Sequence, residues 1–348
     1  MVDQPIRIGI VGLGSIVRQR HIPGLRPIAG VQIVAVSNST PASSQRAARE
    51  FGIERTFERW QDLVAWEGLD AVLVGTPPCL HRQVTIAALD ANKHVFCQAR
   101  MAMNAADARL MLARAAQSDR TTMLCPPPHF MRGDRVLRRL IAGGYLGDLY
   151  HLNVRWYTDE YGDPQAPLHW RQDASISGVN TLTVGMLAEV TQRWVGDARR
   201  VVARAFTATP ERRGTDGRPR KVDRPDSITV AADMAQGGLG SFLFSGIAHH
   251  PGPNSVELFG SAGTIKYDYQ ADRIVGARTG EAEVQEIPIP PQDARSWTVE
   301  ADFIAAIRNG NRTPEPSFAD GVRYMDFTEG IFRSAEQGVV VELPLSAS

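Results

Sequence analysis

The sequence predicts an α/β protein of two domains: an N-terminal doubly wound parallel sheet and a C-terminal α/β domain with an open, largely antiparallel sheet. Apolar strand-like runs alternate with helical segments in the first third of the chain, and strands of two-residue polarity alternation fill the second half. At 348 residues the chain exceeds what one hydrophobic core normally serves. We expect the domains to comprise residues 1–125 and 126–348.

Five apolar runs bounded by turn residues predict the strands of the first domain. They are residues 6–12, 31–37, 70–76, 94–98 and 121–127. Helical periodicity lies between them, as in residues 80–92 and 104–117, where Asn104 is placed as an N-cap. Strands that alternate with helices form right-handed crossover units, and hence a parallel sheet buried on both faces.

The second half begins with a helix that we expect to end at Gly143 and Gly144. Strands of alternating polarity follow at residues 148–158, 199–208, 226–235, 238–248 and 255–269. One face of such a sheet packs against helices and the other is free to pair with another subunit, which predicts a homo-oligomer. We expect the basic stretch 209–226 to be a solvated loop rather than a lid, and the tail to be a long helix ended by Gly338 and a short strand.

Composition excludes several classes of partner. Lys and Arg together number 38, as do Asp and Glu, so no net charge attracts nucleic acid or anionic membrane, and a small molecule is the expected partner. No apolar stretch is long enough to cross a bilayer, and the first residues lack a secretory pattern. The three cysteines, an odd number, indicate reduced thiols and a cytoplasmic address.

The cysteines also raise the question of a metal. Cys79, Cys97 and Cys125 each stand near the end of a predicted strand, and His81 and His129 are close to two of them. No pair has the spacing typical of zinc ligands, and small buried thiols are common at strand ends, so we expect no metal site.

The first strand is followed by a glycine-rich turn. Gly12 permits the tight turn, and Gly14 lets a pyrophosphate approach the backbone where Ser15 and Ile16 begin a helix. Val17 stands in place of the usual third glycine. The alternative is a plain strand-to-helix turn, but the crossover strands that follow favour a Rossmann dinucleotide-binding domain.

The end of the second strand bears on the choice of dinucleotide. NAD enzymes normally carry a carboxylate there to hold the ribose hydroxyls, but this chain has Asn38 and Ser39. With no negative charge to repel a 2′-phosphate, we expect NAD(P), leaning to NADP. The other residues expected to contact the cofactor are Thr76, Pro77, His81 and Gln98.

These motifs resemble the glucose-fructose oxidoreductase, inositol dehydrogenase and rhizopine-catabolism (Gfo/Idh/MocA) family over essentially the whole chain. The matching segments are residues 9–16, 70–81, 88–97, 140–156, 256–268 and 333–343. The resemblance implies a nicotinamide held between a Rossmann domain and a C-terminal substrate-binding and oligomerisation domain. It also implies hydride transfer between NAD(P) and a carbinol carbon of a sugar, cyclitol or related polyol.

The chain departs from the family at two places. Members usually carry Glu-Lys-Pro after the fifth strand, the lysine hydrogen-bonding the reacting hydroxyl, where this chain has Gln98, Ala99 and Arg100. Members also carry an aspartate and a histidine on a helix of the second domain, which align with Thr183 and Leu187. Removing a general acid-base typically costs about a hundred- to ten-thousand-fold in rate, so this divergent member needs another proton path or another chemistry.

Several polar residues remain as catalytic candidates by this alignment. They are Gln98, Arg100, Tyr157, His169, Arg171, Asn180 and Thr183. Thr183 can donate or accept a hydrogen bond, and Tyr157 is a candidate acid. Arg171 with Trp170 either clamps a ring or carboxylate, or is a surface arginine beside a structural tryptophan. His81 is either catalytic or a side chain that lines the cofactor pocket.

Three functions follow from this set. The first is an NAD(P)-dependent oxidoreductase in which His169, Tyr157 or His81 replaces the missing lysine and histidine. The second is a lyase, hydratase or isomerase with no net redox change. The third is a catalytically silent cofactor-binding subunit. The resemblance favours redox chemistry, while the altered site argues against the usual proton path.

Overall fold

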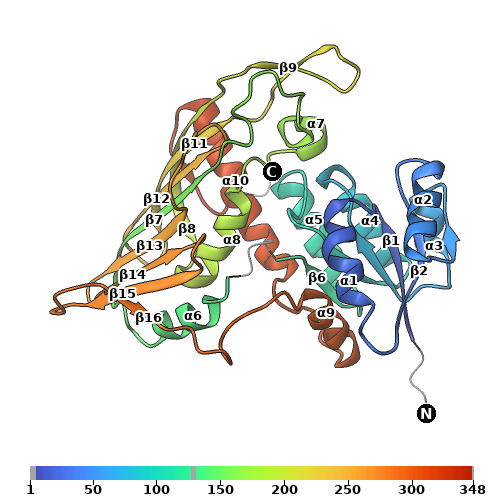
Figure 1. Cartoon of the computed structure of the whole chain (residues 1–348), viewed down its shortest axis with the longest axis horizontal. Coiled ribbons are helices and arrows are strands. Elements are labelled where there is room, and N and C mark those ends of the chain that lie inside the picture. Colours follow the sequence, from blue (N-terminus) through green and yellow to red (C-terminus); the bar gives the residue numbers. More distant parts are fainter. Residues whose placement is uncertain (1–4, 127–130, 347–348) are drawn as a thin grey trace. The chain divides into compact units, whose positions relative to one another are not determined.

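The computed structural model describes residues 5–126 and 131–346 and divides into two compact units (Figure 1). Residues up to 126 together with 298–322 form the first unit, and residues 127–297 with 323–348 form the second. The predicted boundary at 125 falls one residue before the first break. The difference is that residues 298–322 return to the first unit, which a continuous division at 125 did not anticipate.

The first unit contains a six-stranded parallel sheet in the order β3-β2-β1-β4-β5-β6, so the predicted doubly wound sheet is confirmed. Its strands are β1 (Ile6–Val11), β2 (Val31–Ser37), β3 (Arg55–Thr56), β4 (Ala71–Val74), β5 (His94–Cys97) and β6 (Thr122–Leu124). The central strands are buried along their length because helices cover both faces. Only the two-residue β3 has no counterpart among the predicted strands.

The helices of the first unit begin where the sequence has cap residues. Asn104 Oδ1 accepts the Asp107 N–H at 2.7 Å and caps α5, as predicted. Thr40 and Ser43 form a capping box at the start of α2. The helices are η1 (Val17–His21, a π-helical turn), α1 (Ile22–Leu25), α2 (Pro41–Phe51), α3 (Trp60–Ala65), α4 (Pro78–Asp90), α5 (Ala105–Ala116) and α9 (Val299–Arg308).

The second unit contains a nine-stranded sheet in which only β7 and β12 pair in parallel among the described strands. Its order is β16-β15-β14-β13-β7-β12-β11-β8-β17. The strands are β7 (Leu149–Tyr157), β8 (Ala198–Phe206), β11 (Ser227–Met234), β12 (Leu239–Ser245), β13 (Ser255–Gly260), β14 (Gly263–Asp268), β15 (Arg273–Arg278), β16 (Gln285–Ile287) and β17 (Val341–Glu342). The expectation of an open, largely antiparallel sheet is confirmed.

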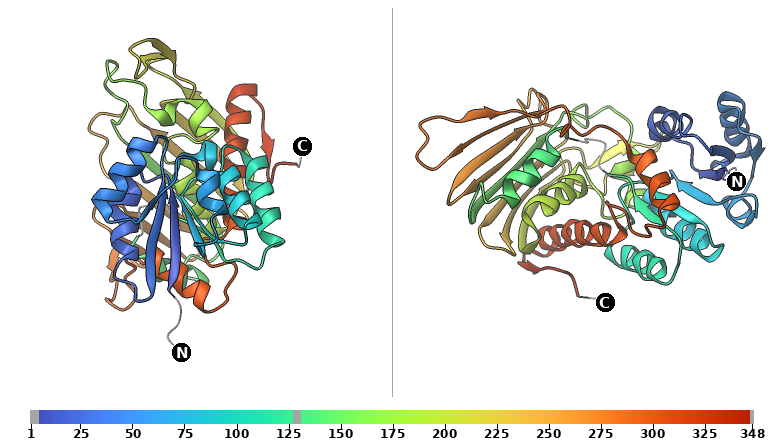
Figure 2. Two further views of the ribbon diagram at one scale, coloured as in Figure 1. Left: turned by 90° about the vertical axis from the view of Figure 1, so that its right-hand side faces the viewer. Right: turned by 90° about the horizontal axis from the view of Figure 1, so that it is seen from below.

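One face of this sheet is covered by helices and the other is not, among the residues described (Figure 2). Alternate residues of β7, such as Leu152 and Val154, are buried, while Asn153 and Arg155 point to the uncovered face. The covering helices are α6 (Asp134–Ala142), α8 (Val184–Val195) and α10 (Phe318–Gln337), and the short turns η2 (Trp170–Gln172) and α7 (Ala174–Ser177) precede α8. The predicted tail helix before Gly338 is confirmed.

The basic stretch 209–226 is more ordered than predicted. It contains a two-stranded hairpin of β9 (Glu211–Arg213) and β10 (Pro219–Lys221). Arg212 is buried, and its guanidinium donates to the carbonyls of Tyr161 and Asp163, each at 2.7 Å. The hairpin therefore holds the loop after β7 in place. No described helix is long and apolar enough to cross a membrane.

Candidate functional site

The glycine-rich turn joins the ends of the central strands. Gly12 has a φ of +87°, and a Cβ there would lie 2.7 Å from the backbone nitrogen of Thr76. Its N–H donates to Ser37 O at 2.9 Å, which ties the turn to β2. A Cβ at Gly14, in contrast, would meet only Gly75 O at 4.0 Å. The turn is thus packed at Gly12 and open at Gly14, where a ligand can approach the backbone.

A cavity of about 360 Å³ opens on this turn. Its lining residues come from the turn, the end of β2, the start of α2 and the loop after β4. They are Val11, Gly12, Leu13, Gly14, Arg18, Ser37, Asn38, Ser39, Ser43, Trp60, Gly75, Thr76, Pro77 and Leu80. The structure therefore brings together six of the predicted cofactor residues, namely Gly12, Gly14, Asn38, Ser39, Thr76 and Pro77. Ser15, Ile16, His81 and Gln98 are not among the residues that line it.

Two groups of the cavity have no partner of their own kind within the described residues. The Thr76 hydroxyl is buried and has no hydrogen-bond partner among the described residues. The indole of Trp60 lines the cavity and packs against no other aromatic ring of the described chain. A dinucleotide offers both groups a partner, since its phosphate and ribose oxygens accept hydrogen bonds and its adenine stacks. Sequence reasoning missed Trp60 and Arg18, because both lie outside the glycine motif.

The corner formed by residues 98–100 contains no side chain with a proton to exchange near neutral pH. Gln98 is buried and its side-chain amide faces Nε2 of His21. His21 Nδ1 in turn lies 2.5 Å from Glu300 Oε1, and both residues are buried. In the tautomer with its proton on Nδ1, His21 donates to Glu300 and accepts from Gln98. Gln98 is thus engaged inside the first unit rather than presented to a ligand.

His81 is a structural link within the first unit. Its ring is fully buried, with Nε2 2.6 Å from Thr76 O and Nδ1 3.0 Å from Arg100 O. Burial lowers the pKa of His81, although the surrounding carbonyls act in the opposite direction. A neutral ring can donate from one nitrogen only, to Thr76 O or to Arg100 O, and either contact ties the ring to the backbone between the loop after β4 and residues 98–101. It is poorly placed to pass protons to a substrate.

In the second unit, α8 carries the positions that align with the family's aspartate and histidine. Thr183 stands just before the helix, and its hydroxyl is buried with no partner among the described residues. Leu187 is buried one turn further on. Asn180 is also buried and donates from Nδ2 to Ser177 O at 2.7 Å. The Thr183 hydroxyl is able to donate or accept a hydrogen bond. Neither position 183 nor position 187 carries a titrating side chain.

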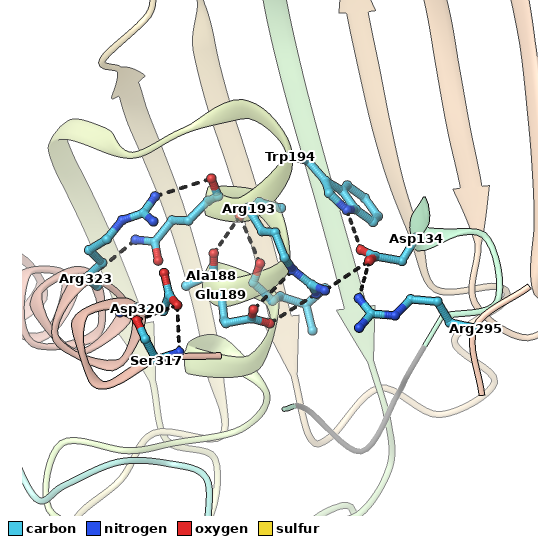
Figure 3. A network of polar contacts seen from close by, with 12 residues as sticks. Asp134, Ala188, Glu189, Arg193, Trp194, Arg295, Ser317, Asp320 and Arg323 are labelled. Carbon is cyan, nitrogen blue, oxygen red and sulfur yellow. Dashed lines mark hydrogen bonds and ion pairs between the residues drawn. The ribbon is translucent and has the colours of Figure 1, made fainter. Parts of the chain in front are cut away.

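A network of charged residues anchors α8 (Figure 3). Asp134 is buried and lies 3.1 Å from Arg193 and 2.7 Å from Arg295, and it accepts the Trp194 N–H at 2.9 Å. Burial raises the pKa of Asp134, but Arg193, Trp194 and Arg295 outweigh burial and hold it below its usual value. Glu189 is likewise buried and pairs with Arg193 at 3.1 Å. This network ties α8 to the start of α6 and to the segment that contains Arg295.

An aromatic cluster follows the loop after β7. The ring of His169 lies 6.0 Å from Tyr161 and 5.7 Å from Trp170, and the Arg171 guanidinium stacks 4.5 Å over Trp170. Burial, followed by the charge of Arg171, lowers the pKa of His169. No carboxylate of the described chain lies within ion-pair distance of Arg171. His169 and Arg171 are therefore brought together, with Tyr161 and Trp170 as their aromatic surroundings.

Tyr157 is placed differently from the other candidates. It is the last residue of β7 and alternates with buried Trp156, so it shares the uncovered face with Arg155, whose guanidinium lies 5.9 Å from its ring. Its backbone N–H donates to Asn254 Oδ1 at 2.8 Å. The structure thus puts Tyr157 on the sheet face opposite the one that α8 covers.

The described residues contain no cluster of three or more potential metal ligands.

These features define a two-domain NAD-binding oxidoreductase. The model described as "Oxidoreductase family, NAD-binding Rossmann fold" matches residues 6–124, and the GFO/IDH/MocA C-terminal domain matches residues 135–266. The chain belongs to the Gfo/Idh/MocA family.

Known relatives agree with this assignment. Levoglucosan dehydrogenase of Pseudarthrobacter phenanthrenivorans is 26% identical over 349 residues, covering 89% of this chain and 89% of that protein. The dTDP-3,4-didehydro-2,6-dideoxy-alpha-D-glucose 3-reductase of Saccharopolyspora spinosa is 27% identical, covering 91% of this chain and 92% of that protein. Levoglucosan dehydrogenase in complex with NADH and L-sorbose has a similar fold, with a TM-score of 0.87 at 24% identity, covering 99% of this chain and 100% of that chain.

Proposed function

We propose that the protein is an NAD(P)-dependent oxidoreductase, leaning to NADP, that acts on a sugar, cyclitol or related polyol or keto compound through a non-standard proton path. The observation that carries the cofactor is the cavity on the glycine-rich turn, which is open at Gly14 and contains the unpartnered Thr76 hydroxyl. The named activities of the relatives, which include levoglucosan dehydrogenase and inositol 2-dehydrogenase, support a sugar or cyclitol substrate.

The residues that would hold the cofactor are those of the cavity. Backbone N–H groups at Gly12 to Gly14 suit the pyrophosphate, and Asn38, Ser39 and Ser43 stand where the adenosine ribose binds in a Rossmann domain. When bound, a nicotinamide supplies a carbon that accepts or donates hydride. The chain's own task is then to orient the substrate and move one proton.

We assign proton handling to His169 and substrate positioning to Thr183 and Arg171. His169 is only half-buried and its lowered pKa favours the neutral ring, which can accept a proton near pH 7. The Thr183 hydroxyl has no partner within residues 5–126 and 131–346 and suits a substrate hydroxyl, while Arg171 suits an oxygen-rich ring or an anionic group. Asn180 shapes this segment of the second unit, Gln98 and Arg100 shape the corner after β5 in the first unit, and Tyr157 is assigned no proton role.

The test is dinucleotide binding followed by turnover. Calorimetry with NAD, NADH, NADP and NADPH should detect binding, and a panel of keto sugars and cyclitols should then change the absorbance of the reduced cofactor. Turnover with no net absorbance change would favour the lyase, hydratase or isomerase alternative. This alternative is the second candidate because residues 98–100 contain no group that titrates near neutral pH. Binding without any turnover would favour the silent subunit. No binding of any form would refute the proposal.

A restoration experiment tests the placement of the altered residues. Ala99→Lys together with Leu187→His returns the usual titrating pair, and we expect sugar or cyclitol dehydrogenase activity to appear or rise by about a hundred-fold or more. The matched control is Ala102→Lys with Leu187→His, which adds the same charge at a buried position three residues further along the same loop. Unchanged activity in the restored variant, with cofactor still bound, would contradict the alignment of residues 99 and 187.

The uncovered sheet face supports an oligomer. Val202, Phe206 and Leu239 of β8 and β12 are exposed on the face that no described helix covers, and such a sheet face is free to pair with another subunit. We propose a homodimer or homotetramer formed through this face in the cytoplasm. Light scattering should give a mass of two or four chains, and Phe206→Lys should reduce it, whereas a monomer at all concentrations would contradict the proposal.

A further inference from the structure

At the end of β2, Asn38 replaces the family's carboxylate and forms hydrogen bonds within the first unit. Asn38 Oδ1 accepts the Leu13 N–H at 2.7 Å, and Asn38 Nδ2 donates to Ser43 O at 3.2 Å. A carboxylate could accept from Leu13 but would repel the Ser43 carbonyl. The amide therefore ties the glycine-rich turn to α2 and carries no charge toward the adenosine end of the cavity. Discrimination at the ribose 2′ position must come from another residue.

Arg18 is the only charged residue that lines the cavity, among the residues described. It lies on η1, directly after the glycine-rich turn, and its guanidinium pairs with Glu50 near the end of α2. The guanidinium also stacks 5.4 Å over the ring of Phe51. About a third of the Arg18 side chain and half of the Glu50 side chain are exposed, with values of 33% and 50%. The ion pair is therefore accessible to a competing anion.

The competition between Glu50 and a phosphate is unequal. Exposed carboxylate–guanidinium pairs contribute little to stability, because water screens them and ordering two long side chains costs entropy. A phosphate monoester carries about −1.5 to −2 charges at pH 7 and binds a guanidinium through two parallel hydrogen bonds. Arg18 itself lines the cavity, so its side chain can turn from Glu50 and Phe51 at the end of α2 to an anion bound in the cavity.

From this geometry, and resting on the proposed cofactor, we propose that Arg18 reads the 2′ position of the adenosine ribose and that Glu50 is its internal competitor. With NADP bound, Arg18 exchanges Glu50 for the 2′-phosphate. With NAD bound, the Arg18–Glu50 pair persists. The strength of this pair sets the ratio of the two affinities, so Glu50 tunes cofactor selectivity without contacting the cofactor.

Calorimetric dissociation constants for NADP and NAD, at one fixed ionic strength, test the inference. Arg18→Gln should weaken NADP binding by roughly 10- to 100-fold and NAD binding by less than about threefold. Glu50→Gln removes the competitor and should tighten NADP binding by roughly two- to fivefold, with NAD unchanged. Arg20→Gln is the matched control, since Arg20 lies on the same helix, is exposed and does not line the cavity. It should leave the ratio of the two constants unchanged.

The outcomes separate this inference from the proposed function. If NADP and NAD both bind to the wild-type protein and Arg18→Gln lowers both affinities equally or neither, the role of Arg18 is refuted while the cofactor proposal stands. An equal loss in Arg20→Gln would show a long-range charge effect and would also refute it. Weaker NADP binding in Glu50→Gln would refute the competition. If neither dinucleotide binds the wild-type protein, the proposed function itself fails.

Discussion

The buried contact between His21 and Glu300 predicts that Gly24→Ala destabilises the first unit, even though alanine is the better helix former. A Cβ built at Gly24, which lies in α1, would approach Glu300 Oε2 to 2.4 Å and Cδ to 2.6 Å. Glu300 is buried and its other carboxyl oxygen faces His21 at 2.5 Å. The added methyl group must therefore push the carboxyl group off the histidine.

The expected magnitude follows from two opposing effects. Losing a hydrogen bond to a charged group costs about 1.5–3 kcal/mol. Replacing glycine by alanine inside a helix returns about 0.5–1 kcal/mol. The net loss in the free energy of unfolding is then about 1–2 kcal/mol. Urea unfolding followed by circular dichroism should show a lower midpoint at an unchanged slope.

A second background turns this into a test of the contact itself. Glu300→Ala removes every Glu300 atom that clashes with the new methyl group, so Gly24→Ala added to Glu300→Ala should be neutral or stabilising by up to about 1 kcal/mol. The effect of one substitution thus changes sign between the two backgrounds. A Gly24→Ala variant as stable as the wild-type protein, or an equal loss in both backgrounds, would refute the reasoning.

Three further outcomes are expected. Trp60→Ala should weaken the binding of NADH and of ADP-ribose by roughly tenfold and Trp60→Phe by less, because stacking on a base contributes about 1–3 kcal/mol; equal affinity in all three proteins by calorimetry would remove Trp60 from the site. Burial, followed by Arg120, lowers the pKa of His94 to about 4. The unfolded chain therefore binds more protons than the folded chain between pH 6.5 and 4. The free energy of unfolding should accordingly decrease as the pH is lowered from 6.5 to 4. His94→Asn, which can keep an acceptor for the Thr121 N–H, should flatten this slope in unfolding curves, and an unchanged slope would contradict the assignment. Arg212→Lys keeps the charge but loses the forked contacts to Tyr161 and Asp163, so residues 158–168 should exchange amide hydrogens faster than in wild type, with β11 unchanged as the internal control.

Periodicity in the sequence predicted the large elements and missed the small ones. The predicted runs stand out because burial on both faces, or on one, leaves a pattern of several residues. Residues 255–269 nevertheless form two strands, β13 and β14, and the six-residue β15 was missed. The two-residue β3 and the three-residue β16 are too short for any period to register. The hairpin of β9 and β10 was not predicted because basic, exposed residues give no apolar pattern. Arg212 is its one buried residue among those described, and its guanidinium donates to backbone carbonyls.

In the candidate site, residues specified by a local motif were predictable and residues joined by long-range contacts were not. Gly12, Gly14 and Asn38 were predictable because a motif specifies them relative to one strand end. The contact of His21 with Glu300 joins residues 279 positions apart, and no local pattern indicates it. The ion pair of Glu189 with Arg193 could have been predicted, because the two residues are four positions apart on α8, the spacing of a helical ion pair.

Two amides, Asn38 and Gln98, stand where the family usually has carboxylates, and both are turned inward. Asn38 bridges an N–H donor and a carbonyl acceptor, which a carboxylate cannot do because it donates no hydrogen bond. Gln98 places its side-chain amide against Nε2 of His21, whose Nδ1 faces Glu300, so the ring lies between one amide and one carboxylate rather than between two carboxylates. Both substitutions therefore remove charge from the first unit without leaving a buried group unsatisfied. This compensation argues that the altered corner is a settled arrangement of the fold rather than a degraded copy of the usual site.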